Sequence, residues 1–219
     1  MTETTDAHKV TTPPASEPVT IDEVKAHLRL DTTADNELIE DQLIPAAREY
    51  CEMVTRRAFV TQTWTLMMNA WGQRADLEWW DGVREGSILG DLPAFVELPG
   101  SPLASVTSVS TFAADNTETT FSADNYYVDT FSTPGRIALN PGVVWPTAGR
   151  NYHGIKIVYV VGYGDATDVP FALRQAVIQL AAHWYENRES IREIGTAGGD
   201  VMVPKGFDNI LRRYKVMRL

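Results

Sequence analysis

The sequence predicts an α+β fold: a bundle of long amphipathic helices with an antiparallel β insertion and a tethered C-terminal helix. Apolar residues recur with helical spacing near both ends of the chain, whereas the region between them alternates apolar and polar residues and is rich in turn signals. Glycines precede the last amphipathic segment. We therefore expect a disordered arm at residues 1–18, a main domain at residues 19–190 and a glycine-tethered segment at residues 191–219.

Composition narrows the class of protein. With 219 residues and 44% hydrophobic content, the chain can bury one sizeable core. The arm is rich in Thr, Glu and Pro and lacks the apolar stretch of a secretory signal. No apolar run approaches the roughly 20 residues of a membrane span, so we expect no membrane partner. The single cysteine, Cys51, excludes an intrachain disulfide and is typical of a reducing cytosol.

The chain is acidic, but its C-terminal end is basic. A formal net charge of −10 argues against a protein that coats nucleic acid by attraction to phosphates. Near the C-terminus the balance reverses, and we expect this end to meet a different partner from the acidic body. From residue 205 onward there is one acid, Asp208, against five basic residues: Lys205, Arg212, Arg213, Lys215 and Arg218.

Two helices are predicted before the β insertion. Thr20 and Glu23 have the spacing of a capping box and start a helix at residues 20–30. A second helix is predicted at residues 35–57, and Pro45 should kink it because proline lacks the backbone N–H that an inner helical turn uses. Its apolar stripe is Ile39, Leu43, Ala46, Ala47, Tyr50 and Val54.

We predict that residues 59–161 form the β insertion. Strands joined by short turns rather than by helices should pair antiparallel. The predicted strands are residues 60–68, 94–98, 105–112, 126–129, 136–140 and 157–161.

A third helix at residues 170–189 follows the last strand. Pro170 lies near its first turn, where a missing N–H costs nothing. Six residues at helical spacing place an apolar stripe on this helix, which must pack against a partner such as the helix at residues 35–57. The stripe is Leu173, Ala176, Val177, Leu180, Ala181 and Trp184.

The C-terminal helix is amphipathic and carries the candidate docking site. Such a helix on a glycine tether can fold back on its own chain or dock on a partner, and we favour docking. The apolar residues Phe207, Ile210, Leu211, Tyr214 and Met217 lie opposite Arg212, Arg213 and Lys215.

The sequence offers little for catalysis. Its glycine pairs lack the spacing of a phosphate-binding loop, and no nucleophile-elbow motif occurs. His27 and His183 are best interpreted as residues at the edge of a core, and Cys51 as a small core residue. We therefore predict no catalytic, cofactor-binding or metal-binding residue. The acids Asp31, Asp35, Glu37, Glu40 and Asp41 are best interpreted as a solvated face near a helix start.

Tryptophans outside the helices are harder to assign. Residues 72–92 are irregular and predict a projecting loop, in which Trp79 and Trp80 are possible interface residues. Together with Trp145, they could equally cover the end of the β region.

Short segments in a fixed order resemble the head-tail connector (adaptor) proteins of long-tailed bacteriophages and gene transfer agents. The resemblance covers most of residues 19–190, whereas the arm and residues 72–92 have no counterpart and Arg57 stands where the family more often has Gly. The matching segments are residues 20–29, 35–38, 46–50, 55–57, 98–103, 106–109, 127–129, 134–137, 145–146, 161–164, 169–170 and 184–189.

The resemblance implies a structural virion protein without catalysis or cofactor. Family members form a ring, typically dodecameric, under the portal vertex of the capsid. The ring extends the channel through which double-stranded DNA passes without specific binding, and it carries the head-closure or tail proteins. Assembly takes place in the host cytoplasm, and the finished protein lies in the virion neck. The family's portal-engaging segment corresponds here to Phe207, Ile210, Leu211, Arg212, Arg213, Tyr214 and Lys215.

A second reading stays open at this stage. The chain could be a small cytosolic enzyme or ligand-binding protein with a pocket between the long helices and the β insertion, using His183 and the acidic cluster. An enzyme should show a concave site with convergent polar groups, whereas an adaptor should show partner-binding surfaces.

Overall fold

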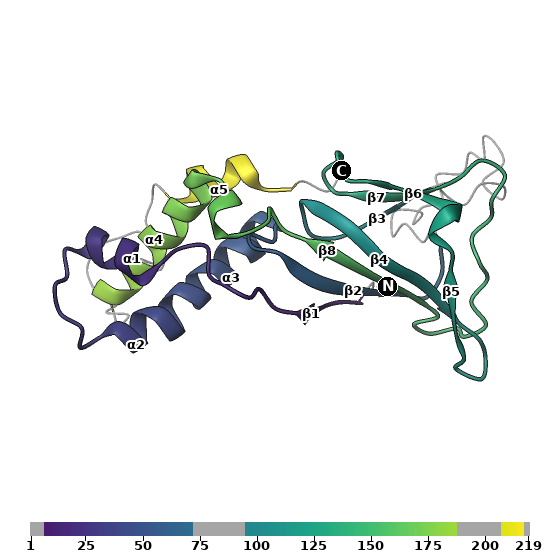
Figure 1. Cartoon of the computed structure of the whole chain (residues 1–219), viewed down its shortest axis with the longest axis horizontal. Helices are drawn as coiled ribbons and strands as arrows, with labels where there is room; N and C mark the ends of the chain where they lie inside the picture. Colours follow the sequence, from purple (N-terminus) through teal and green to yellow (C-terminus); the bar gives the residue numbers. More distant parts are fainter. Residues whose placement is uncertain (1–6, 72–94, 188–206, 217–219) are drawn as a thin grey trace, which may run out of the picture. The chain divides into compact units, whose positions relative to one another are not determined.

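The computed structural model describes residues 7–71, 95–187 and 207–216, which form two compact units (Figure 1). The β unit contains the described residues up to Pro13 and those from Gln62 to Val161. The helical unit contains residues 14–61 and the described residues from Gly162 onward. Within the described residues, no helix has both the length and the apolar composition to cross a membrane.

The larger sheet of the β unit has five strands in the order β1-β2-β8-β4-β5, and every pair in it is antiparallel. Its central strand β8 alternates buried and half-buried residues, because one face packs inward and the other faces outward. The strands are β1 (Ala7–Thr12), β2 (Gln62–Met68), β8 (Ile155–Val161), β4 (Leu103–Phe112) and β5 (Glu118–Phe121).

A smaller antiparallel sheet, in the order β3-β7-β6, supplies the opposing layer of the β unit (Figure 1). Val96 and Ile137 are buried on its inner face, as are Leu66 and Ile157 on the inner face of the larger sheet. The sheets approach closely at Gly135, where an added Cβ would lie 2.4 Å from the Leu103 side chain. The strands are β3 (Phe95–Glu97), β7 (Arg136–Leu139) and β6 (Tyr126–Asp129), the last preceded by the 3-10 turn Ala123–Asn125.

The helical unit is built around α4 (Phe171–Glu186). Before it come α1 (Ile21–Leu28), α2 (Asn36–Leu38), a π-helical turn (Ile39–Leu43) and α3 (Ile44–Thr55), with the 3-10 turn Ala166–Asp168 leading into α4 and α5 (Phe207–Tyr214) after it. The capping box at Thr20 and Glu23 is confirmed, because each accepts a hydrogen bond from the other's backbone N–H.

Helical geometry continues from Asn36 to Thr55 through the proline. Ile44 donates its N–H to the carbonyl of Ile39, one residue farther back than in an α-helix. Pro45 follows at the start of α3. A π-helical turn just before a residue that cannot donate accommodates the missing hydrogen bond without ending the helix.

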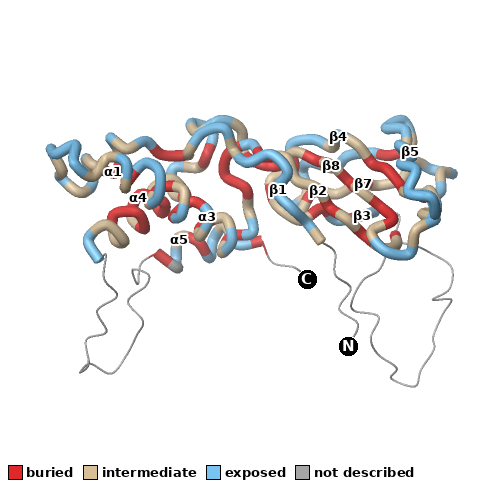
Figure 2. Tube along the Cα trace, turned by 90° about the horizontal axis from the view of Figure 1, so that it is seen from below, coloured by how far each residue is buried: buried red, intermediate tan, exposed pale blue. Residues whose placement is uncertain are grey.

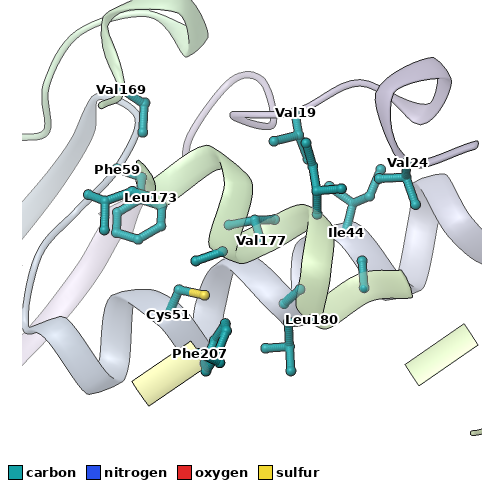
Figure 3. Packing of buried hydrophobic residues seen from close by; sticks show 14 of the residues in the cluster. Val19, Val24, Ile44, Cys51, Phe59, Val169, Leu173, Val177, Leu180 and Phe207 are labelled. Atoms are coloured by element: carbon teal, nitrogen blue, oxygen red, sulfur yellow. The ribbon is translucent and has the colours of Figure 1, made fainter. Parts of the chain in front are cut away.

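One apolar core holds the helical unit together (Figures 2 and 3). The predicted stripe of α4 is buried from Leu173 to Ala181, and its sixth residue, Trp184, is half-buried. Figure 3 shows Cys51, Leu180 and Phe207 in this core, contributed by α3, α4 and α5. Each helix therefore buries its stripe against the others.

The predicted bundle of long amphipathic helices is wrong. The longest α-helix among the described residues is α4, with 16 residues, and α1 and α5 have eight each. In the described part of the other unit there are eight strands in two antiparallel sheets. The spacing of apolar residues predicted one long helix at residues 35–57. This stretch is only partly α-helical, because it contains the π-helical turn Ile39–Leu43.

The N-terminal region departs from its predicted disorder at β1. This strand lies inside the range predicted as a disordered arm, and it pairs with β2. The His8 ring stacks on Trp64 with centroids 5.4 Å apart, and the Thr11 and Thr65 hydroxyls are hydrogen-bonded at 2.6 Å. Both contacts join residues distant in sequence, so local composition could not indicate them.

Leu180→Ala should destabilise the protein by roughly 2–5 kcal/mol, because it leaves a cavity where three helices meet. Urea unfolding of the full chain measures this free energy. Met53→Ala is the control: Met53 lies on α3 but is 68% exposed, so its free energy of unfolding should change by less than about 0.5 kcal/mol. Equal losses in both variants would contradict the core assignment.

Candidate interaction surfaces

The C-terminal helix α5 packs on the chain's own helical unit. Phe207 and Leu211 are fully buried in the core, and the Phe207 ring centroid lies 6.1 Å from that of Tyr50. From the sequence, we favoured docking of this helix on a partner over folding back on its own chain. In this structure its apolar residues fold back, so Phe207 and Leu211 are not available to another protein in this conformation.

Hydrogen bonds fix the end of α5 against the end of α3. Arg57 donates from Nε to the Tyr214 carbonyl at 2.6 Å and from Nη1 to the Tyr163 hydroxyl at 3.1 Å. Val216 donates its N–H to the Thr55 carbonyl at 3.0 Å. Burial raises the pKa of Tyr163, although the nearby Arg57 guanidinium acts in the opposite direction. The exposed side of α5 therefore has a defined orientation on the helical unit.

That exposed side is basic. Arg212, Arg213 and Lys215 are exposed, and Ile210 and Tyr214 are half-buried beside them. Arg56, which sequence reasoning missed as a site residue, is also exposed and follows Thr55, the residue to which Val216 is bonded. We call Arg56, Arg212, Arg213 and Lys215 the basic surface.

Acidic residues gather at the start of the helical run from Asn36 to Thr55, whose end precedes Arg56 of the basic surface. Asp31, Glu37, Glu40 and Asp41 are exposed, whereas Asp35 accepts a hydrogen bond from the Tyr185 hydroxyl at 2.6 Å. A run of 20 residues from Asn36 to Thr55 separates the ends by roughly 30 Å at 1.5 Å per residue. Acids at its start and bases at its end also complement the helix dipole.

A buried ion-pair network attaches the segment before α1 to α3. Arg48 is 6% exposed and lies 2.8 Å from Glu17 and 2.7 Å from Glu52, measured from guanidinium nitrogen to carboxylate oxygen. Glu52 also accepts the Phe59 N–H at 2.7 Å. Burial raises the pKa of Glu52, against the effects of the Phe59 N–H and of Arg48. Removing Arg48 would leave two partly buried carboxylates without their cation.

Arg174 makes the matching attachment to α4. It donates to the Pro18 carbonyl at 2.9 Å and to the Glu23 carboxylate at 2.6 Å. Burial acts to raise the pKa of Glu23, but the Thr20 N–H and Arg174 outweigh it and lower that pKa. Both networks attach the segment before α1 to the helices of this unit.

The residues considered for chemistry are separated or buried. His27 is exposed on α1, and the half-buried His183 has its Nδ1 3.2 Å from the Asn187 amide nitrogen. Cys51 is fully buried, and burial raises its pKa to about 12. Among the described residues, no group of three or more His, Cys, Asp or Glu side chains could hold a metal ion.

Of the three tryptophans considered as interface residues, the structure describes Trp145. Trp79 and Trp80 lie outside the described residues. Trp145 is 7% exposed and stacks on Trp71 with ring centroids 4.2 Å apart, and Trp71 Nε1 donates to the Pro146 carbonyl at 2.7 Å. Of the two readings of Trp145, the structure favours the one in which it covers part of the β region.

Known proteins resemble part of this sequence and its whole fold. Residues 147–215 match the family model described as phage gp6-like head-tail connector protein. A chain from the neck of an empty gene transfer agent particle, computed with C6 symmetry, is 25% identical, with a TM-score of 0.70 and 97% of each chain covered. In residues 147–215 and in its fold, the chain therefore resembles the head-tail connector proteins of particle necks.

Two further structures share the fold of this chain. A chain from the virion of a native gene transfer agent particle is 23% identical with a TM-score of 0.69, covering 97% of this chain and 96% of that one. A chain from the neck of a native particle, computed with C12 symmetry, is 22% identical with a TM-score of 0.66, covering 98% and 97%. The comparison with curated proteins finds no match.

The thiol of Cys51 should be unreactive in the folded protein, because burial removes access and the raised pKa leaves it protonated near neutral pH. Labelling with a chromogenic disulfide reagent at pH 8 should be slow and should accelerate with denaturant in parallel with unfolding. Rapid labelling without denaturant would contradict the core role of Cys51.

Proposed function

We propose that this structural connector forms a ring in the particle neck, beneath the portal vertex, and joins the capsid to the head-closure or tail proteins. The observation that carries the proposal is the basic surface, held in a defined orientation on an otherwise acidic chain. A cationic surface can bind one acidic partner, and the acidic remainder of the chain's surface is then free to bind other proteins.

A ring of twelve copies is the arrangement we favour. The solved necks that this chain resembles were computed with C6 and with C12 symmetry. A twelve-fold ring satisfies both, because C12 symmetry includes C6. Cyclic assemblies need two different surfaces on each copy, so that each copy binds the next head to tail.

The portal is proposed to bind the basic surface. Arg212, Arg213 and Lys215 would pair with portal acids, and Ile210 and Tyr214 would supply apolar contact beside them. Phe207 and Leu211, buried in the core, would act indirectly by holding α5 in place. This assigns the seven predicted docking residues two roles, contact and support.

The charge of the chain suits a DNA channel. With a net charge of −10, the ring repels the phosphates of double-stranded DNA and lets the duplex slide without specific binding. Work of this kind requires no cofactor and no catalysis. We therefore propose a non-enzymatic protein that is assembled in the host cytoplasm and retained in the virion.

Neutralising Arg212, Arg213 and Lys215 to Gln should abolish binding of the purified connector to portal assemblies, because each surface cation contributes to steering and pairing. Native mass spectrometry, or light scattering after size separation, measures association with the portal. The wild-type chain should co-migrate with the portal, and rising salt should weaken its binding.

The control removes three charges from the acidic end instead, as Asp31→Asn, Glu37→Gln and Glu40→Gln, and should leave portal binding intact. Wild-type chain that ignores the portal would overturn the proposed function. Equal binding by the Gln variant and the wild type would exclude the basic surface as the docking site.

A further inference from the structure

The outer face of the smaller sheet carries aromatic side chains. In the register of β3, β7 and β6, Phe95 and Tyr127 flank Ala138 in one row. Phe95 is 38% exposed and Tyr127 is 60% exposed. Side chains two residues apart on a strand share a face, so this apolar row faces outward while Val96 and Ile137 face the core.

A charged row lies beside the aromatic row on the same face. Arg136 is paired in register with both Glu97 and Asp129, and its guanidinium lies 3.2 Å from Glu97 and 4.8 Å from the centroid of the Phe95 ring. Two carboxylates and one guanidinium give this row a formal charge of −1, as counted from those three residues.

A fixed turn presents a third aromatic residue after β6. Phe131 is 99% exposed. The Asp129 carboxylate accepts the N–H of Phe131 at 3.0 Å and that of Ser132 at 3.1 Å, and the Ser132 hydroxyl also donates to it. Holding such a large apolar side chain in water on an ordered turn costs free energy that a partner would recover.

These residues supply part of the area that an interface between proteins needs. We call Phe95, Tyr127 and Phe131, with the charged row, the aromatic surface. From their exposed fractions, the three rings present on the order of 400 Å² of mainly apolar area, about half of the ~800 Å² that one partner contributes to a standard interface.

The outer face of the larger sheet is complementary in character. Met67, Val158 and Val160 are half-buried there, among hydroxyl side chains such as Thr63 and Thr65. Neighbouring strands place charged side chains on this face. Lys9 is in register with Thr65, and Lys156 forms an ion pair with Glu118 at 3.1 Å. Two lysines and one carboxylate give +1 against the −1 of the aromatic surface. We call this face the threonine surface.

We propose that the aromatic surface of one copy binds the threonine surface of the next copy, so that this contact closes the ring. The inference rests on the proposed ring. The two surfaces are the outer faces of different sheets of one sandwich, and the inner faces of these sheets pack together in the core. One copy can therefore use both surfaces at once. Different surfaces on each side give the head-to-tail contact that a cyclic ring requires. Their opposite charges favour this pairing over the contact of two aromatic surfaces, which would bring like charges together.

Two variants each disable one surface. Phe131→Glu places a charge on the aromatic surface, and Met67→Glu places one on the threonine surface. Phe131 is almost fully exposed, so its replacement should not disturb folding. Met67 stands opposite Lys156 in the sheet register, so a glutamate there gains a cross-strand partner. Phe171→Glu is the control, since Phe171 is 74% exposed on the helical unit.

Sedimentation of the full-length chains over a range of concentrations measures self-association. The wild type and Phe171→Glu should form species larger than dimers, and each surface variant should weaken self-association by more than about tenfold. An equal mixture of Phe131→Glu and Met67→Glu should form dimers and stop there, because the two chains together retain one intact contact.

A wild-type chain that stays monomeric, or a Phe131→Glu chain that assembles like the wild type, would overturn the inference. Mixtures of the two surface variants that stay monomeric would overturn the pairing of these surfaces. Portal binding is measured separately, so a chain that fails to bind the portal yet passes this test would overturn the proposed function and leave the interface standing.

Discussion

Burial of the apolar stripe of α4 is the constraint on which the helical unit depends. Leu173, Val177 and Leu180 have no exposed area, and α1, α3 and α5 each contact this helix. Helices of eight residues, such as α1 and α5, are unstable alone in water because nucleation costs more than a few hydrogen bonds return. Their existence here follows from packing. The orientation of the basic surface therefore depends on residues at the opposite side of α5.

Local signals predicted elements well where the chemistry is local. The Thr20 capping box, the stripe from Leu173 to Ala181 and the alternation of β8 could all be read from neighbouring residues. Elements held by distant partners could not. β1 exists through its pairing with β2, more than 50 residues away. The predicted long helix failed for a related reason, since helical spacing does not distinguish α-helix from the π-helical turn before Pro45.

In the candidate surfaces, too, neighbouring residues predict some features and only distant contacts determine others. An amphipathic pattern marks Phe207 and Leu211 as apolar and Arg212 as polar, but it does not say whether the apolar half meets its own chain or another. The bond from Arg57 to the Tyr214 carbonyl, 157 residues apart, gives the answer for this structure. Aromatic residues in strands are ordinarily interpreted as core. Only the register that aligns Phe95 with Ala138 and Tyr127 places them outward.

Charge and apolar area have different uses in a protein that joins others. Pairing of exposed charges speeds encounter and selects a partner, but salt screens it and its net free energy is small. Apolar area excludes water and contributes the lasting part of the binding free energy. A protein that must join its neighbours once and then hold gains from keeping these tasks apart. The basic surface suits selection of the portal. In the proposed ring, contact between copies needs permanence, and the exposed aromatic residues of the β unit would contribute apolar area to it.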